Sequence, residues 1–226
     1  VFSGALLVLT DNRYARVPSL NLNAYNILAT TPLDVQSVEA VLGPAAALYG
    51  PNSASGVMHI ITKSPFDEQG TALSIAGGGR RILQGVARQA WANDDQTVGF
   101  KVSGQYFRGD DFSYSDPAEQ AAAAANPGTV IGQRNTGPER YSVEARMDFP
   151  PWDNPDDDII FTYGLSELIN SVEMTGIGAS QAQNWKYQFA QARLRKGSLF
   201  AQAFWNGSDA GNTYLLRTGG KIVDES

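Results

Sequence analysis

The sequence lacks the residue types on which several common kinds of site depend. It has no cysteine and a single histidine, His59, among its 226 residues. The absence of cysteine excludes disulfides, thiolate metal ligands and cysteine nucleophiles, and one histidine cannot supply a histidine-rich metal site or an HExxH helix. A Ser-His-Asp triad would depend on His59, which lies in an apolar, strand-like run. We therefore expect no catalytic residue, no metal ligand and no cofactor, and no enzyme activity.

Long apolar runs and basic clusters are also missing. No stretch of 18 apolar residues is present, so the sequence contains no candidate transmembrane helix. The formal net charge is −6 and lysine and arginine form no run, which argues against nucleic acid as a partner. A membrane is not excluded, because a transmembrane β-strand needs only about ten residues that alternate between apolar and polar.

The N-terminal residues Val1–Gly4 carry no methionine and no basic signal-peptide region. We read the chain as a piece of a longer precursor.

The most informative stretch runs from Val38 to Lys63 and reads VEAVLGPAAALYGPNSASGVMHIITK. Gly43, Gly50 and Gly56 stand where a positive φ or a close backbone approach is cheap. Val57–Thr62 is rich in β-branched residues and is bounded by turn residues, which predicts a strand. Because this run is almost continuously apolar, we expect it to lie in a small mixed sheet and to be buried on both faces.

This stretch resembles the end of the plug domain of TonB-dependent outer-membrane receptors. The family pattern is roughly VEVLRGP, a small residue, SALYG, and then GGV-x-N-IIT-[KR]. Leu42 stands where the family has arginine, and His59 where it has asparagine. The missing arginine puts in question any plug-to-barrel salt bridge that this residue would supply. The matching residues, in order, are Val38-Glu39, Gly43-Pro44, Ala47-Leu48-Tyr49-Gly50, Gly56-Val57 and Ile60-Ile61-Thr62-Lys63.

The resemblance implies a barrel of roughly 22 strands with a plugged lumen. Residues 1–66 would be the C-terminal part of the plug, without the energy-coupling box that contacts the TonB-type energising protein. Residues 67–226 would be about the first seven barrel strands. By position, the loop after the first plug strand is the plug apex, so its amides and phenol are candidate substrate contacts or simply a polar loop. These candidates are Asn21, Asn23, Tyr25 and Asn26, and they suit a polar ligand such as a metal chelate, a glycan or a peptide.

From residue 71 onward, apolar and polar residues alternate with period two, which is typical of half-buried strands. In the strand around Glu144 and Arg146 we expect these two side chains to face the lumen. Val143, Ala145 and Met147 should then face lipid. The predicted strands are 71–78, 82–92, 97–107, 141–149, 159–166, 185–194 and 198–205.

The predicted connections between these strands alternate in length. Apart from a brief first one near Arg80-Arg81, short ones at 93–96, 150–157 and 196–197 alternate with long ones at 108–140 and 169–184, which is typical of an outer-membrane barrel. Within the first long connection, Asp116 can cap a helix that begins at Pro117. An alanine-rich disordered loop is the open alternative there, because five alanines cannot hold a helix unaided.

The predicted fold class is therefore mainly β: a partial plug of mixed α/β structure followed by antiparallel transmembrane β-barrel strands of an incomplete chain. The predicted function is a receptor or transporter of the bacterial outer membrane that takes up a scarce polar substrate, with outer-membrane lipid, a TonB-type protein and the substrate as partners. The alternative is a non-transport, β-rich surface or interaction protein, because seven strands are odd and cannot close. We expect residues 1–226 alone not to form a stable monomer.

Overall fold

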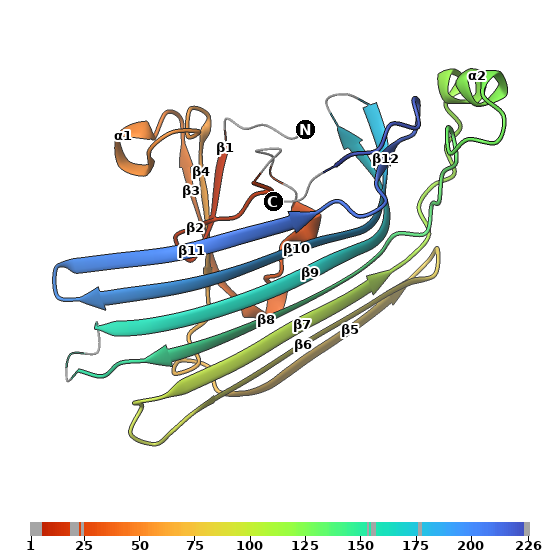
Figure 1. The fold of residues 1–226 in the computed structure, drawn as a ribbon. Coiled ribbons are helices and arrows are strands. Elements are labelled where there is room, and N and C mark those ends of the chain that lie inside the picture. Colours follow the sequence, from red (N-terminus) through yellow and green to blue (C-terminus); the bar gives the residue numbers. More distant parts are fainter. Residues whose placement is uncertain are drawn as a thin grey trace.

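The computed structural model describes residues 6–18, 23, 25–152, 154, 157–175 and 178–223. The fold is mainly β and consists of two sheets (Figure 1). A small sheet has the strand order β2-β1-β4-β3, and a large sheet has the order β11-β10-β9-β8-β7-β6-β5. The small sheet stands over the concave face of the large one.

Within the described residues, no helix has the length and apolar character needed to cross a membrane.

The small sheet is mixed, as predicted. It contains β1 (Leu6–Thr10), β2 (Arg13–Tyr14), β3 (Val35–Leu42) and β4 (Gly56–Thr62), with α1 (Ala46–Tyr49) between the last two. β4 pairs in parallel with β1 and antiparallel with β3. The hairpin between β1 and β2 closes through Asp11 and Asn12, which both have positive φ angles of 46° and 70°, as a type I′ hairpin turn requires.

The burial predicted for Val57–Thr62 is wrong for the middle of the strand. Val57 and Thr62 are buried, but the four residues between them are half-buried. The neighbouring strand β3 is exposed along most of its length, with Val38 at 55% exposure. Within the described part of the chain, no second layer covers that side of the small sheet, so an apolar run there does not become a fully buried strand.

The large sheet contains the seven predicted strands, each paired antiparallel with its neighbour in sequence. A short strand, β12 (Tyr214–Leu215), also pairs with β10. The predicted helix forms as α2 (Pro117–Ala125), where the Asp116 side chain accepts a hydrogen bond from the Ala118 backbone N–H. The strands are β5 (Gly70–Gly78), β6 (Ile82–Ala92), β7 (Gly99–Arg108), β8 (Glu139–Phe149), β9 (Asp158–Thr175), β10 (Gly178–Lys196) and β11 (Leu199–Asp209).

The long connection predicted at 169–184 is wrong. β9 continues to Thr175 and β10 begins at Gly178, so this region is a two-stranded extension of the sheet. The polar residues that suggested a loop are buried strand residues, since Asn170, Ser180 and Gln181 are all buried. Ser180 and Gln181 are consecutive, so both faces of β10 are covered here. This extension projects at the same end of the sheet as α2 and β12, which we call the long-loop end, while the opposite, short-turn end carries the connections at 93–98, 150–157 and 197–198 (Figure 1).

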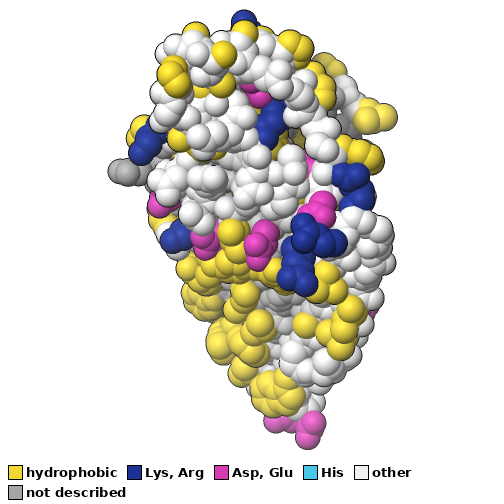
Figure 2. All heavy atoms as spheres, turned by 90° about the vertical axis from the view of Figure 1, so that its right-hand side faces the viewer, with side chains coloured by type: hydrophobic (Ala, Val, Ile, Leu, Met, Phe, Trp, Pro, Cys, Tyr) yellow, Lys and Arg dark blue, Asp and Glu magenta, His cyan; other side chains and the backbone are white. Residues whose placement is uncertain are grey.

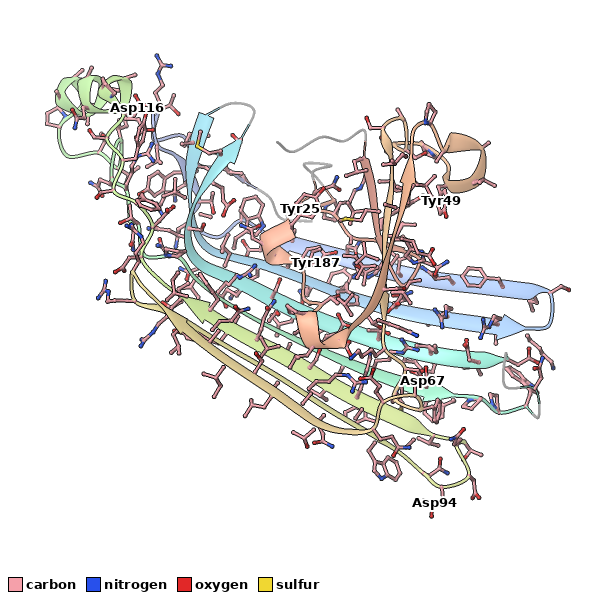
Figure 3. The ribbon with its side chains drawn as sticks, turned by 180° about the vertical axis from the view of Figure 1, so that it is seen from behind. Tyr25, Tyr49, Asp67, Asp94, Asp116 and Tyr187 are labelled. Atoms are coloured by element: carbon pink, nitrogen blue, oxygen red, sulfur yellow. The ribbon has the colours of Figure 1, made fainter. Side chains whose placement is uncertain are left out.

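The two faces of the large sheet differ as the alternation predicts. On β8, Val143 and Met147 are exposed on the convex face, whereas Glu144 and Arg146 are 2% and 5% exposed on the concave face. The small sheet and the segment before β3 cover this concave face (Figure 3). The side on which each residue lies is therefore confirmed, while contact of the convex face with lipid stays a prediction.

The concave face is apolar only where β9 and β10 meet the chain between β2 and β3. Ile27 and Ala29 pack there in one buried cluster with Leu168, Tyr187 and Phe189. The Phe189 ring lies directly over Gly164 of the neighbouring strand. A Cβ atom at position 164 would stand 2.2 Å from that ring and 3.1 Å from the Ala29 side chain. Glycine is thus required at position 164 for the segment to sit close to the sheet.

We predict that Gly164→Ala lowers the free energy of unfolding by about 1–3 kcal/mol, the range for overpacking a filled core. Gly85→Ala is the matched control, because a Cβ atom at position 85 meets nothing within 4 Å. Denaturant titration in detergent measures both variants. Equal losses in the two variants would contradict the packing described for Gly164.

Candidate functional site

The four residues predicted to contact substrate lie in different surroundings. Asn23 is buried, and its side-chain amide donates to the Leu6 carbonyl over 2.8 Å. Tyr25 opens the short 3-10 helix η1 (Tyr25–Ile27) and is 46% exposed. The Asn26 side chain donates to the Glu173 carboxylate. Asn21 lies outside the described residues. The structure therefore places Tyr25 and Asn26 together on the concave side, while the Asn23 amide turns inward to hold β1.

Asn26 belongs to a polar group that sequence reasoning missed. Arg140 of β8 donates to the Asn26 carbonyl over 2.8 Å, and Ser171 of β9 donates to Glu173 over 2.6 Å. These residues lie far from Asn26 in the sequence, so their spacing carries no signal. The available signal was the alternation of β8, which places Arg140 on the same face as Glu144.

The segment from Ile27 to Asp34 runs across the concave face and is held there by polar side chains of the large sheet. Ser166 donates to the Ile27 carbonyl, and Ser142 donates to the Ala29 carbonyl over 3.0 Å. The Thr30 hydroxyl donates to Glu144 over 3.0 Å. Successive inward-facing positions of β9 and β8 thus satisfy the backbone of a segment that has no sheet partner of its own.

Asp34, at the end of the 3-10 helix η2 (Pro32–Asp34), is fully buried against two strands of the large sheet. One carboxylate oxygen accepts from Arg88 Nε over 2.8 Å, and the other accepts from Lys101 Nζ over 2.7 Å. Both cations are themselves buried, at 3% and 1% exposure. Charges removed from water in this way are retained only when each is paired and hydrogen-bonded, so the three groups depend on one another.

Thr62, at the end of β4, joins this group to a second one. Its hydroxyl donates to Asp11 over 2.7 Å and accepts from Lys101 and Arg146 over 2.9 and 3.0 Å, which uses all of its hydrogen-bonding capacity. Arg146 in turn forms a two-bond contact with Asp148 at 2.7 and 2.6 Å. We call Asp11, Asp34, Arg88, Lys101, Arg146 and Asp148, arranged around Thr62, the ion cluster.

The ion cluster holds three cationic and three carboxylate side chains, so its formal charges balance. Burial alone would raise the pKa of Asp11, but the Arg146 guanidinium and the two hydrogen bonds from Thr62 outweigh this and hold that pKa below its ordinary value. The cluster connects the small sheet to β6, β7 and β8. It is the main polar link between the two sheets.

A second link uses Arg13 of β2. Its guanidinium donates to the Tyr187 hydroxyl over 2.8 Å and to Asn206 over 3.0 Å. It also lies 3.5 Å from the centroid of the Phe189 ring, a cation–π arrangement. Leu42, in contrast, is 91% exposed, so the position where the family pattern has arginine makes no such link here.

A polar cavity of about 600 Å³ lies beside the ion cluster, toward the short-turn end. Its lining includes Thr62, Arg146 and Asp148 of the ion cluster together with Trp152, Arg193 and Arg195. Asp158 pairs with Arg195 over 3.1 Å at its edge. The cavity therefore presents both positively and negatively charged side chains between the two sheets.

Several solved structures share this fold. The copper transporter OprC matches with a TM-score of 0.63 and 16% identity, over 92% of this chain and 30% of its own. The FrpB iron transporter from Neisseria meningitidis (F3-3 variant) matches with a TM-score of 0.58 and 11% identity, over 91% and 33%. The ferripyoverdine receptor of the outer membrane of Pseudomonas aeruginosa matches with a TM-score of 0.53 and 9% identity, over 89% and 27%.

No protein-family model and no curated protein matches the sequence. The chain spans about a third of the length of these solved structures. At these identities the likeness establishes the fold, and the predicted fold class is confirmed: part of a plug followed by antiparallel β-barrel strands, as in TonB-dependent outer-membrane receptors.

We predict that Asp34→Asn destabilises the fold by about 3–5 kcal/mol, because it leaves the buried Arg88 and Lys101 without their shared counter-charge. Glu68→Gln is the matched control, since Glu68 forms an ion pair with Lys63 in an exposed place and its loss should leave stability unchanged. Urea titration in detergent measures both. A loss no larger in Asp34→Asn than in Glu68→Gln would show that the ion cluster does not hold the sheets together.

The lowered pKa of Asp11 predicts a pH dependence. A carboxylate whose pKa is depressed in the folded state stabilises the fold above its ordinary pKa of 3.8, and this stabilisation is lost as the pH falls through the folded value. The wild-type protein should therefore lose stability more steeply below about pH 4 than Asp11→Asn, in which that group cannot titrate. Parallel slopes for the two proteins in acid unfolding would contradict this role for Asp11.

Proposed function

We propose that this chain is part of a TonB-dependent receptor of the bacterial outer membrane that imports a scarce polar substrate. Residues 1–66 are the C-terminal part of its plug, and residues 67–226 are its first barrel strands. A TonB-type protein supplies the energy through a contact box that is not in this chain. The likeness to a copper transporter, an iron transporter and a ferripyoverdine receptor favours a metal or metal chelate over a glycan or a peptide.

The observation that carries this proposal is the polar character of the contact between plug and barrel strands. The segment around Thr30 and Asp34 meets the strands through hydroxyls, carboxylates and cations more than through apolar packing. Hydrogen bonds of this kind can be exchanged for bonds to water as the plug moves. An apolar contact of the same size would expose its surface to water, so a polar contact suits a plug that must open and close.

The loop from Asn21 to Asn26 is proposed as the substrate-contacting apex of the plug. Tyr25 presents its ring on the open side of the concave face (Figure 3). Asn26, with Arg140 and Glu173, offers amide, cationic and carboxylate groups next to it. The buried Asn23 contributes by fixing the loop to β1. The apex thereby combines one exposed aromatic ring with polar groups of both signs, as a charged chelate would require.

The second candidate is a non-transport surface or interaction protein. It is favoured by the open sheet, in which β5 and β11 stand at the two edges. Edge strands of this kind pair readily with another chain. A protein with that role would need no movement of the plug, so restraining the plug distinguishes the two functions.

We predict that tethering the plug abolishes uptake. Thr30→Cys and Glu144→Cys place two thiols on opposite sides of a native contact, in a chain without other cysteines. Because a cysteine is shorter than the glutamate it replaces, the two thiols are joined by a short bifunctional thiol reagent whose linker contains a disulfide. Uptake of radiolabelled iron, supplied as ferric chelates, and of radiolabelled copper is measured in cells that express the protein, before and after cross-linking. Cross-linking should stop uptake and a reductant, which cleaves the linker, should restore it, whereas each single-cysteine variant should be insensitive to both. Uptake that persists while the cross-link is fully formed would refute the transport proposal.

A further inference from the structure

The long-loop end of β6, β7 and β8 carries a group of charged residues on the convex face. A cavity of about 250 Å³ lies there, lined by Arg81, Arg108, Asp110 and Glu139. Arg108 pairs across the strands with Leu83 and with Glu139, so these three side chains share one face of the sheet. Leu83 is exposed, and that face is therefore the convex one. We call Arg81, Arg108, Asp110 and Glu139 the rim group.

The rim group stands where the apolar surface of the convex face ends. Arg108 lies eight positions after the exposed Phe100 on β7, which corresponds to roughly 26 Å along the strand. At the strand tilt of about 40° that barrels have, this is roughly 20 Å along the membrane normal, which fits within the apolar band of about 25 Å that surrounds a transmembrane barrel. Exposed apolar residues between these levels include Leu73, Ile75, Val143 and Phe161. Figure 2 shows charged side chains gathered at the boundary between the apolar lower part and the paler upper part.

Two tyrosine hydroxyls donate hydrogen bonds to glutamates at the height of the rim group on the convex face. Tyr106 donates to Glu139 over 2.7 Å, and Tyr141 donates to Glu167 over 2.6 Å. Tyrosine concentrates where a membrane meets water, because its ring is apolar and its hydroxyl is polar. The two pairs are therefore placed where lipid headgroups are expected. Each hydroxyl also supplies one hydrogen bond to a carboxylate at that height.

The arginines of the rim group remain available to a ligand. Arg81 lies in the tight turn between β5 and β6 with a φ of 52°, and its guanidinium contacts Asp110 with two bonds of 2.6 Å. Its side chain is nevertheless 84% exposed, and two of its five N–H groups serve Asp110. Arg108 is also exposed. The hydrogen bond from Arg81 lowers the pKa of Asp110, so Asp110 is a carboxylate that competes with a ligand for part of the Arg81 guanidinium.

We propose that Arg81 and Arg108 bind a phosphate group of a lipid in the outer leaflet of the membrane. A guanidinium presents parallel N–H groups that match phosphate oxygens, and the apolar surface below would hold the acyl chains of the same molecule. Arg80 stacks on Phe112 at 3.7 Å and adds a third cation to the turn. This inference rests on the outer-membrane location in the proposed function.

The test is a binding titration of the purified protein in neutral detergent with diphosphoryl lipid A as the probe. Arg81→Ala/Arg108→Ala should weaken binding by about tenfold or more, the effect of losing charge-assisted hydrogen bonds. Arg195→Ala/Lys196→Ala is the matched control, because it removes two positive charges at the short-turn end and should bind as the wild type does. Lipid A from which both phosphates have been removed should bind wild-type protein as weakly as diphosphoryl lipid A binds the arginine variant.

Asp110→Ala separates phosphate binding from a merely structural role of the ion pair. This variant frees Arg81 and should bind lipid A at least as tightly as the wild type. Weakening equal to that of the arginine variant would overturn the proposal, and so would unchanged binding in the arginine variant or full competition by millimolar inorganic phosphate. Metal uptake should be unaffected in the arginine variant. A failed lipid titration therefore contradicts only the lipid-binding proposal, whereas a failed transport assay contradicts the proposed function.

Discussion

The buried carboxylate of Asp34 is the contact on which the arrangement of the two sheets depends. It neutralises Arg88 and Lys101, which come from adjacent strands of the large sheet and have no access to water. Lys101 in turn binds Thr62 at the end of β4, so the position of the small sheet follows from the same interaction. Buried ion pairs contribute little net stability compared with apolar packing, but breaking one is strongly unfavourable. The ion cluster therefore acts mainly to specify where the plug sits.

The two faces of the barrel strands serve different surroundings. Toward the plug, the strands present serines, carboxylates and cations that bind the backbone and side chains of residues 27–34. Away from it, they present an apolar band that ends at tyrosines and arginines near the long-loop end. Because successive side chains of a strand point to opposite faces, the period-two pattern gives each strand one polar face and one apolar face. Under the proposed function, the polar inner face would let the plug move, and the apolar outer face would let the strands remain in lipid.

The sequence allowed the strands to be predicted, because alternation is local and needs no knowledge of partners. It also allowed the sides of Glu144 and Arg146 to be assigned. The ion cluster could not be predicted in full, since Asp11 and Asp34 look like ordinary turn residues and their partners lie 54 to 135 positions away in sequence. The hairpin of β9 and β10 was mistaken for a loop because Ser180 and Gln181 are polar and bond to other polar groups. Both faces of β10 are covered there, so polar and apolar residues do not alternate and the local pattern does not indicate a strand.

The central claim is that the plug segment is held as one unit by the ion cluster. Hydrogen exchange of the wild-type protein and of Asp34→Asn in detergent tests this most directly. In the variant we expect faster exchange in peptides that cover residues 25–34 and 56–63, where the Lys63 amide donates to the Asp34 carbonyl and the Thr62 amide donates to Asp11. Exchange in β9 and β10 should be unchanged. Faster exchange confined to the residues next to Asp34, or spread equally over the barrel strands, would contradict the account.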